Sequence, residues 1–448
     1  MKRIVGALAV LGAVVGYGMV REEPAPAKAE APKVEATKAD PDANLTPSQR
    51  LALAKLTGAT GADRAVTDAQ EAARQNPQKD DTWVLLGRAW VRKARESGDP
   101  GFYVNADAAA EVVLSRAPEH KLALDVRGLV LLNAHKFEEA RELASRIVER
   151  HPENPMAWGT LSDALLELGR YDEATEAAQK MIDLKPNLPS YSRGSHLQWM
   201  RGEVTRAKQT VRAAIDAGRD TKRDPEPGAW VIVQAASIFW NEGDLEGALA
   251  GADKAKERIP SFAPANVLAG RVALAQGDAH RAVDLFEKAY AASPLVETAW
   301  LLGDAREAAG DRPGAEKAWA LVEKEGKRSD PRTLSLFYST KNVHADESLA
   351  LAEEEFGVRK DVVTEDALAW ALYRKGRVAE AKEHIVHARR LGTPDPRLVY
   401  HEGAIRIAAG ETVQGKKLVA KALEMNKGFD RTAAREAESL LAEKVASR

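Results

Sequence analysis

The chain has 448 residues, of which 44% are hydrophobic and 29% charged, and its formal net charge is −2. This balance is typical of a folded globular protein and excludes wholesale disorder, and the near-neutral charge argues against a protein built to bind nucleic acid. The chain has no cysteine, which excludes disulfides, thiolate metal sites, cysteine nucleophiles and a lipidated N-terminal cysteine.

The amino terminus has the pattern of an export signal. Lys2 and Arg3 precede an uncharged apolar run over residues 4–20, and this order of segments directs a chain to a membrane. We therefore assign residues 1–20 as a signal peptide or an N-terminal membrane anchor, because the length of the run fits a cleaved signal and a membrane tether equally. Since the positive residues come first, the bulk of the chain is expected to be exported, either periplasmic or anchored to the inner membrane facing the periplasm.

A proline-rich segment follows the apolar run. Residues 21–45 consist largely of alanine, proline, glutamate and lysine. Proline removes backbone donors and favours extended backbone, so this segment cannot form a core. We predict a disordered linker between the export signal and the folded part of the chain.

From residue 46 onward, the sequence repeats with a period near 34. In one unit, Trp158, Leu161 and Leu165 share a face of a first helix, which Gly169 ends before a second helix begins. A small residue early in the second helix, where two helices cross, recurs with steps of 34, 33, 41, 34, 33 and 66 at Ala140, Ala174, Ala207, Ala248, Ala282, Ala315 and Ala381. The pattern predicts stacked helix pairs that share one continuous core.

These units resemble the tetratricopeptide repeat family. The resemblance is carried by Trp158, Leu161, Leu165, Ala174 and Pro186 in one unit and by Ala269, Gly270, Ala282, Phe286, Ala289 and Pro294 in another. It covers residues 46–429 as about eleven helix pairs, and residues 430–448 supply a C-terminal capping helix and tail. The resemblance implies an all-α fold, an α-solenoid coiled into a superhelix, whose concave groove is lined by the first helix of each pair.

Aromatic and charged residues at the groove offsets of this register are candidate binding residues. The register assigns Trp83, Trp90, Trp158 and Trp319 to the core and places the other five tryptophans on the concave face. Exposed aromatic residues on such a face are typical binding anchors, whereas a one-residue error in register would put some of them in the core. The predicted partner-binding residues are His196, Trp199, Trp230, Trp240, Trp300, Trp370, Tyr373, Tyr400, Arg88, Arg92, Arg271 and Arg374.

No motif for catalysis, a metal or a cofactor is present, and the repeats leave no room for a catalytic domain. His384 and His387 are three residues apart on one helix but lack a third ligand nearby. The sequence therefore predicts a non-enzymatic protein–protein interaction scaffold of the bacterial cell envelope. It would bind a peptide segment or a folded partner in the concave groove, with no cofactor and no nucleic acid. The alternative is a glycan or small-ligand binding protein that uses the groove tryptophans.

Overall fold

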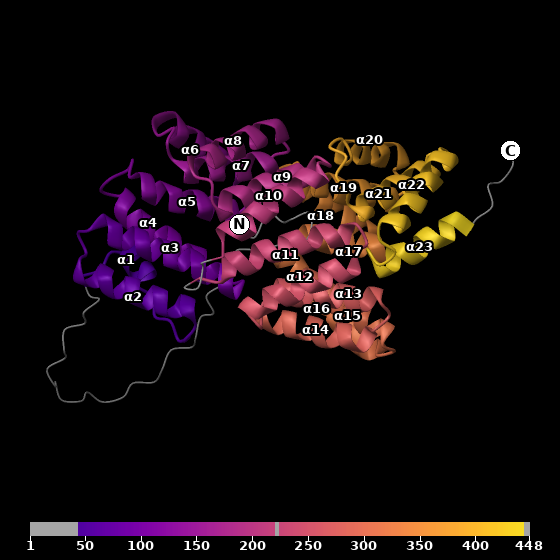
Figure 1. Ribbon diagram of the computed structural model, residues 1–448, viewed down its shortest axis with the longest axis horizontal. Helices are drawn as coiled ribbons and strands as arrows, with labels where there is room; N and C mark the ends of the chain where they lie inside the picture. Colours follow the sequence, from indigo (N-terminus) through magenta and orange to yellow (C-terminus); the bar gives the residue numbers. More distant parts are fainter. Residues whose placement is uncertain (1–43, 220–223, 443–448) are drawn as a thin grey trace, which may run out of the picture. The chain divides into compact units, whose positions relative to one another are not determined.

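We analysed a computed structural model of the chain, which describes residues 44–219 and 224–442 (Figure 1). The predicted signal or anchor over residues 1–20, and all but the end of the predicted linker over residues 21–45, lie outside the described residues. In the part that the structure describes, 23 helices follow one another without a strand. None of these helices has the length and apolar character needed to span a membrane.

The described residues divide into two compact units between Val130 and Leu131. The first unit contains α1 (Pro47–Ala52), α2 (Gly61–Gln75), α3 (Asp80–Ser97), α4 (Phe102–Leu114) and most of α5 (Lys121–Asn133). Its core is an apolar cluster centred on the buried side chains of Trp83, Leu86 and Trp90.

The second unit contains the remaining helices of the described chain. They are α6 (Phe137–Arg150), α7 (Pro155–Glu167), α8 (Tyr171–Leu184), α9 (Leu188–Met200), α10 (Val204–Ala217), α11 (Glu226–Asn241), α12 (Leu245–Arg258), α13 (Ala263–Ala275), α14 (Ala279–Ala292), α15 (Val296–Ala308), α16 (Arg312–Ser329), α17 (Pro331–Lys341), α18 (Ala345–Val358), α19 (Val362–Arg374), α20 (Val378–Ala388), α21 (Pro396–Ala408), α22 (Thr412–Met425) and α23 (Arg431–Ala442). Within this unit, α7 to α22 form eight consecutive pairs of contacting helices, and α23 follows them alone. This arrangement confirms the predicted all-α solenoid.

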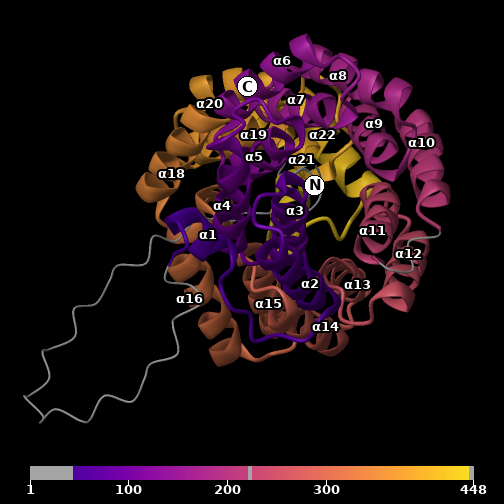
Figure 2. The same cartoon turned by 90° about the vertical axis from the view of Figure 1, so that its left-hand side faces the viewer.

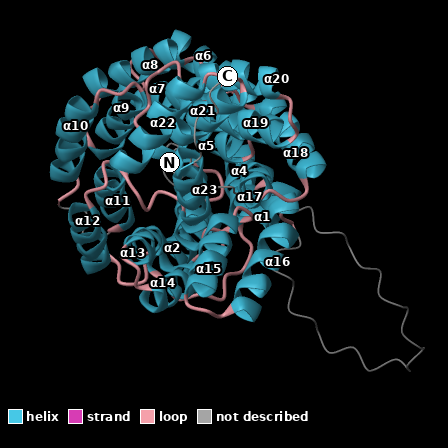
Figure 3. Ribbon diagram, turned by 90° about the vertical axis from the view of Figure 1, so that its right-hand side faces the viewer, coloured by secondary structure: helices cyan, strands magenta, loops and turns pink. Residues whose placement is uncertain are grey.

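The two helices of a pair have different surroundings. In the second unit, the first helix of each pair lies inside the superhelix, as α11, α13, α19 and α21 do, and the second helix lies outside, as α10, α12, α18 and α20 do (Figures 2 and 3). Small residues permit the close approach within a pair. A Cβ on Gly270 would lie 2.7 Å from the ring of Phe286, which is fully buried and contributes about 1.5–3 kcal/mol of apolar burial.

The superhelix of the second unit is tight enough for successive turns to touch. Residues 186 to 193 positions apart are joined by hydrogen bonds, which we call the seam: Arg359 to Glu167 (3.3 Å), Val362 N–H to Tyr171 Oη (2.7 Å), Thr393 Oγ1 to the Met200 carbonyl (2.6 Å) and Asn426 Nδ2 to the Trp240 carbonyl (2.7 Å). Because one repeat is about 34 residues, one superhelical turn takes between five and six helix pairs.

Glycine turns between paired helices make the seam possible. A Cβ on Gly169, Gly202 or Gly243 would lie 3.0 Å or less from a backbone carbonyl oxygen of the next turn, that of Lys360, Gly392 or Met425. Real Cβ atoms do not approach backbone oxygens this closely, so the absence of a side chain at these three positions lets the two turns stack in direct contact.

Candidate partner-binding surface

The structure buries the tryptophans that the register places on the concave face. Their exposed fractions are 1% for Trp199, 3% for Trp230, 5% for Trp240, 6% for Trp300 and 0% for Trp370. The prediction that these side chains are exposed is therefore wrong. The inner helices pack closely enough for their aromatic side chains to cover one another, whereas the predicted groove assumed an open surface. Their participation in binding stays a prediction.

The assignment of the other four tryptophans to the core is half correct. Trp83 and Trp90 are each 1% exposed, and their indole N–H groups donate to the carbonyls of Pro77 and Ala52. Trp158 and Trp319 are only half-buried. Trp158 lies at the outer surface between α6 and α8, and Trp319 lies on an outer helix beneath the ammonium group of Lys341.

Three of the buried tryptophans pack separately along the inner helices. Trp199 lies parallel to His196, with ring centroids 6.3 Å apart, and Trp230 meets Phe262 edge-on at the same distance. Trp300 contacts Phe337 edge-on at 5.5 Å and donates its indole N–H to Asp304. These three aromatic rings therefore pack against other side chains of the same protein.

Four predicted residues do come together at the C-terminal end of the unit. The Trp370 ring stacks on Tyr373 at 4.8 Å and meets Tyr400 edge-on at 5.6 Å, and the Arg374 guanidinium lies 4.4 Å from its centroid. The ring of His401 also stacks on Trp370, with its centroid 3.9 Å away at an interplanar angle of 14°. We call Trp370, Tyr373, Arg374, Tyr400 and His401 the aromatic cluster.

Charged residues of the inner helices pair with one another across neighbouring repeats. The pairs are Asp163–Arg193, Arg271–Glu297, Asp304–Lys341, Arg332–Asp361, Asp366–His401 and Arg374–Glu436. Burial raises the pKa of the Asp304 carboxyl to about 6, although the Lys341 ammonium 2.7 Å away opposes that effect. The mixed charges of the inner face thus compensate one another. We call these six pairs the ladder, and two predicted residues, Arg271 and Arg374, belong to it.

The two remaining predicted arginines belong to the first unit. Arg88 and Arg92 lie on α3, where Arg88 is exposed and Arg92 is half-buried. The other ten predicted residues lie on inner helices of the second unit, which we consider by itself.

Several buried polar atoms of the inner helices have no hydrogen-bond partner among the described residues. They include His196 Nδ1, Trp199 Nε1, Trp370 Nε1 and His401 Nε2, all in side chains at most 2% exposed. Burial lowers the pKa of His196 to about 4, so this imidazole is neutral at pH 7. An unsatisfied buried donor is costly, and a ligand that supplies an acceptor removes that cost.

Sequence analysis missed several residues of this surface. His401 and Glu436 were not predicted, yet His401 belongs to the aromatic cluster and Glu436 contacts Arg374. The ladder pairs offered one signal, because opposite charges on successive inner helices are 26 to 37 residues apart in five of the six pairs. For Glu436, 62 residues from Arg374, the repeat period offered none.

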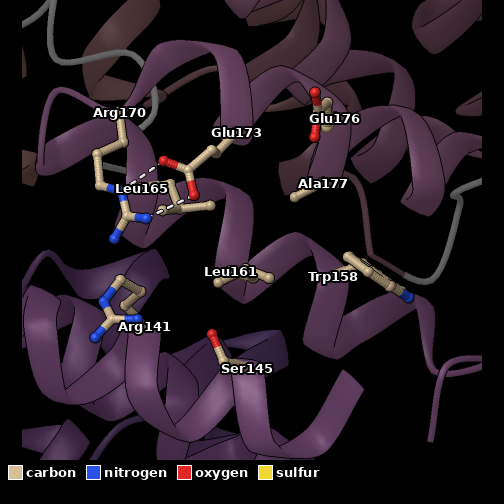
Figure 4. A pocket seen from close by; sticks show the side chains of 9 residues that line it. All are labelled: Arg141, Ser145, Trp158, Leu161, Leu165, Arg170, Glu173, Glu176 and Ala177. Atoms are coloured by element: carbon tan, nitrogen blue, oxygen red, sulfur yellow. Dashed lines mark hydrogen bonds and ion pairs between the residues drawn. The ribbon is translucent and has the colours of Figure 1, made fainter. Parts of the chain in front are cut away.

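A hollow lies at the surface formed by α6, α7 and α8 (Figure 4). It has a volume of about 170 Å³ and an apolar floor of Trp158, Leu161 and Leu165. Its rim includes Arg170 and Glu173, which form an ion pair of 2.6 Å with each other. The rim charges are thus already compensated.

The helix pairs match a known family in two stretches. A tetratricopeptide repeat model matches residues 126–189 and 267–331. The chain is a tetratricopeptide repeat protein. A TPR repeat-containing protein of Pseudomonas aeruginosa is 29% identical over 171 residues, a stretch that covers 36% of this chain. The stretch spans only 28% of that relative's length.

Solved structures with similar helix arrangements are more distant in sequence. PilW, a type IV pilus biogenesis factor, is 15% identical with a TM-score of 0.40, and the match covers 47% of this tetratricopeptide repeat protein and 95% of PilW. The human IFIT1 dimer with m7Gppp-AAAA is 13% identical with a TM-score of 0.47, over 87% of this chain and 96% of IFIT1. Such likenesses concern the fold alone.

Proposed function

We propose that this tetratricopeptide repeat protein is a non-enzymatic scaffold of the bacterial cell envelope that binds a peptide segment or a folded partner on the inner face of its second unit. Tetratricopeptide repeat proteins generally act as non-catalytic scaffolds for protein partners. The observation that carries the proposal is the set of unpartnered polar atoms on the inner helices: His196 Nδ1, Trp199 Nε1, Trp370 Nε1 and His401 Nε2.

A polypeptide is the ligand that this chemistry favours. Two of the four atoms are indole N–H donors, and a peptide offers a carbonyl acceptor at every residue. Because each buried unsatisfied donor costs about 1–3 kcal/mol, supplying acceptors would add to the free energy of binding. The charged side chains of the inner helices already form ion pairs with one another. They would therefore contribute to specificity by exchanging these ion pairs for pairs with a bound partner.

The envelope location rests on the amino terminus. Lys2, Arg3 and the apolar run over residues 4–20 are typical of an export signal or anchor. The measurement that tests it is the intact mass of the purified protein together with its distribution between membrane and periplasmic fractions. Recovery of the full-length chain from the cytoplasm alone would contradict an envelope location.

The partner proposal is tested by removing the donors while keeping the rings. A Trp199→Phe, Trp370→Phe variant should lose at least about tenfold in capture of partners from envelope extracts, measured by quantitative mass spectrometry. The matched control is Trp158→Phe, which alters a half-buried tryptophan at the outer surface. Helical circular dichroism should be the same in all three proteins. Equal capture by the double variant and the control would refute binding through the inner donors.

The glycan alternative receives less support from the geometry. Sugar rings stack on free aromatic faces, but the faces of Trp370 are occupied by His401 and Arg374, and those of Trp300 and Trp230 contact phenylalanines. A peptide carbonyl would need access to the indole N–H of Trp370 alone and not to a ring face, although that N–H is buried as well.

A further inference from the structure

The last helix, α23, lies on the inner side of the superhelix. Seen end-on, it falls within the ring that the outer helices of the second unit form (Figure 3). It contacts α22, which precedes it, and also the inner helices α21 and α17. A helix that merely closed the end of the stack would contact the last pair, whereas α23 also reaches an inner helix that begins about a hundred residues earlier.

Specific polar contacts hold α23 against these inner helices. Arg374 of α19 donates two hydrogen bonds to the Glu436 carboxylate, at 2.8 and 2.6 Å. Lys341 of α17 donates to Thr432 Oγ1 at 3.1 Å. A forked pair of this kind fixes orientation as well as distance, so Glu436 determines where α23 lies along α19.

These contacts cover the aromatic cluster. The Arg374 guanidinium, which donates to Glu436, also lies over the rings of Trp370 and Tyr373. Phe429, just before α23, packs on Tyr400 with ring centroids 5.7 Å apart. Burial and the nearby Glu436 carboxylate raise the pKa of Tyr400. The chain's own C-terminal segment therefore occupies the surface where four of the predicted partner-binding residues meet.

The apolar contact that α23 makes is small. Its buried side chains are Ala433, Ala434 and Ala437, and three methyl groups bury far less area than the leucines and tryptophans that hold the repeats together. Arg435 and Glu438, on its other face, are exposed. The helix is thus held by the Glu436 ion pair, by the hydrogen bonds from Lys341 to Thr432 and from Lys416 to the Leu441 carbonyl, and by its short connection to α22. That connection keeps its effective concentration near the millimolar range.

We propose that α23 is a displaceable strap: it occupies the position on α17, α19 and α21 where a helix of a partner protein binds. The ligand that fits is an amphipathic helix with a small, alanine-rich face and a carboxylate that reaches Arg374. When this partner helix binds, it would release α23 and contact Trp370, Tyr373 and Tyr400 in place of α23. This inference rests on the proposed scaffold function, for which it names the class of partner.

The probe for this proposal is a fluorescein-labelled peptide with the sequence of residues 427–442, titrated by anisotropy into the full-length protein. In wild type, the tethered α23 competes with the peptide. Glu436→Arg opposes Arg374 with a like charge, frees the surface and should tighten peptide binding by at least about tenfold. The matched control is Glu438→Arg, which makes the same charge change on the exposed face and should bind the peptide as wild type does. Adding Arg374→Ala to the Glu436→Arg protein should reverse the gain.

Equal peptide affinity of the Glu436→Arg and Glu438→Arg proteins would overturn the strap. Hydrogen exchange on the wild-type protein gives a second measurement that needs no variant, since amides of α23 should exchange at least about tenfold faster than those of α21. Equal protection of the two helices would mean that α23 is a fixed cap. Both experiments are independent of envelope partners, so a failed capture would refute the proposed function and leave the strap intact.

Discussion

Two sets of turns in the second unit share one sequence feature and differ in what surrounds them. Gly169, Gly202 and Gly243 lie against backbone carbonyls of the next superhelical turn, whereas Gly277, Gly310, Gly376 and Gly410 have no atom within 4 Å of where a Cβ would be. All seven have positive φ. A glycine with positive φ therefore ends the first helix in seven repeats, whereas Asn342 takes this position between α17 and α18. In three of the seven repeats the glycine also contacts the next superhelical turn at the seam. The predictions below separate these two roles.

The largest effect is expected at Arg359, whose guanidinium bonds to Glu167 across the seam and lies 3.1 Å from Glu355. Arg359→Met removes the positive charge that compensates two buried carboxylates and should lower the free energy of unfolding by about 3–5 kcal/mol. The control Arg377→Met removes an exposed arginine paired with Glu380 and should leave the urea midpoint close to that of wild type, because solvent screens a surface ion pair. Urea unfolding measures both. Similar losses in the two variants would mean that the seam adds no stability.

The second effect concerns His196, which burial keeps neutral near Asp361, the ion-pair partner of Arg332. Its folded-state pKa of about 4 lies below the ordinary 6.5, so its contribution to stability is complete above pH 6.5 and is lost as the pH falls toward 4. The loss should approach about 3 kcal/mol by pH 4.

His196→Gln should therefore show a smaller drop in unfolding free energy between pH 7 and pH 4 than wild type. His387→Gln, which changes an exposed imidazole, is the control and should keep the wild-type dependence. A parallel pH dependence in His196→Gln would show that this imidazole is not the titrating group.

The third prediction compares two turns directly. Gly310→Ala introduces a side chain at φ +85° in open space, which costs about 1 kcal/mol. Gly243→Ala introduces one at φ +76° against the Met425 carbonyl, which should cost about 1–3 kcal/mol more because one superhelical turn must shift. The melting temperature and the urea midpoint of the two variants give the difference. If the two alanine variants were equally stable, the turns would not be in contact at Gly243.

The smallest effect is expected from a single seam hydrogen bond. Thr393→Val removes the 2.6 Å bond to the Met200 carbonyl and should cost about 1 kcal/mol. Thr175→Val is the control, because its hydroxyl bonds within α8 to the Tyr171 carbonyl. That change should cost at most about half as much. Equal costs would indicate that the Thr393 bond is replaced by water.

The helix pairs could be predicted because their signals are local. The alanine at each helix crossing and the glycine at each turn both act within one repeat. The seam could not be predicted in this way. Contacts such as Tyr171 with Val362 depend on small rotations accumulated over more than five pairs, and no period in the sequence records their sum.

The sequence allowed the position of the candidate surface to be predicted, but not the burial of its side chains. The register put Trp370, Tyr373, Arg374 and Tyr400 on one inner face, and they do contact one another. Exposure failed because it depends on what else reaches that face, and Glu436 reaches it from a helix that the register treats as a terminal cap. Burial by a distant segment leaves no trace in the spacing of the residues it covers.

The seam also constrains how the number of repeats can change. An open solenoid can gain or lose a helix pair anywhere, since each pair contacts only its neighbours. Here, deletion of the pair α13 and α14 would bring a segment one repeat further along the chain opposite Gly169, and Tyr171 would no longer face Val362. Every seam contact that spans the deletion would lose its partner at once. Insertions and deletions should therefore be selected against from α8 to the end of α22, because the seam contacts extend from Glu167 to Asn426.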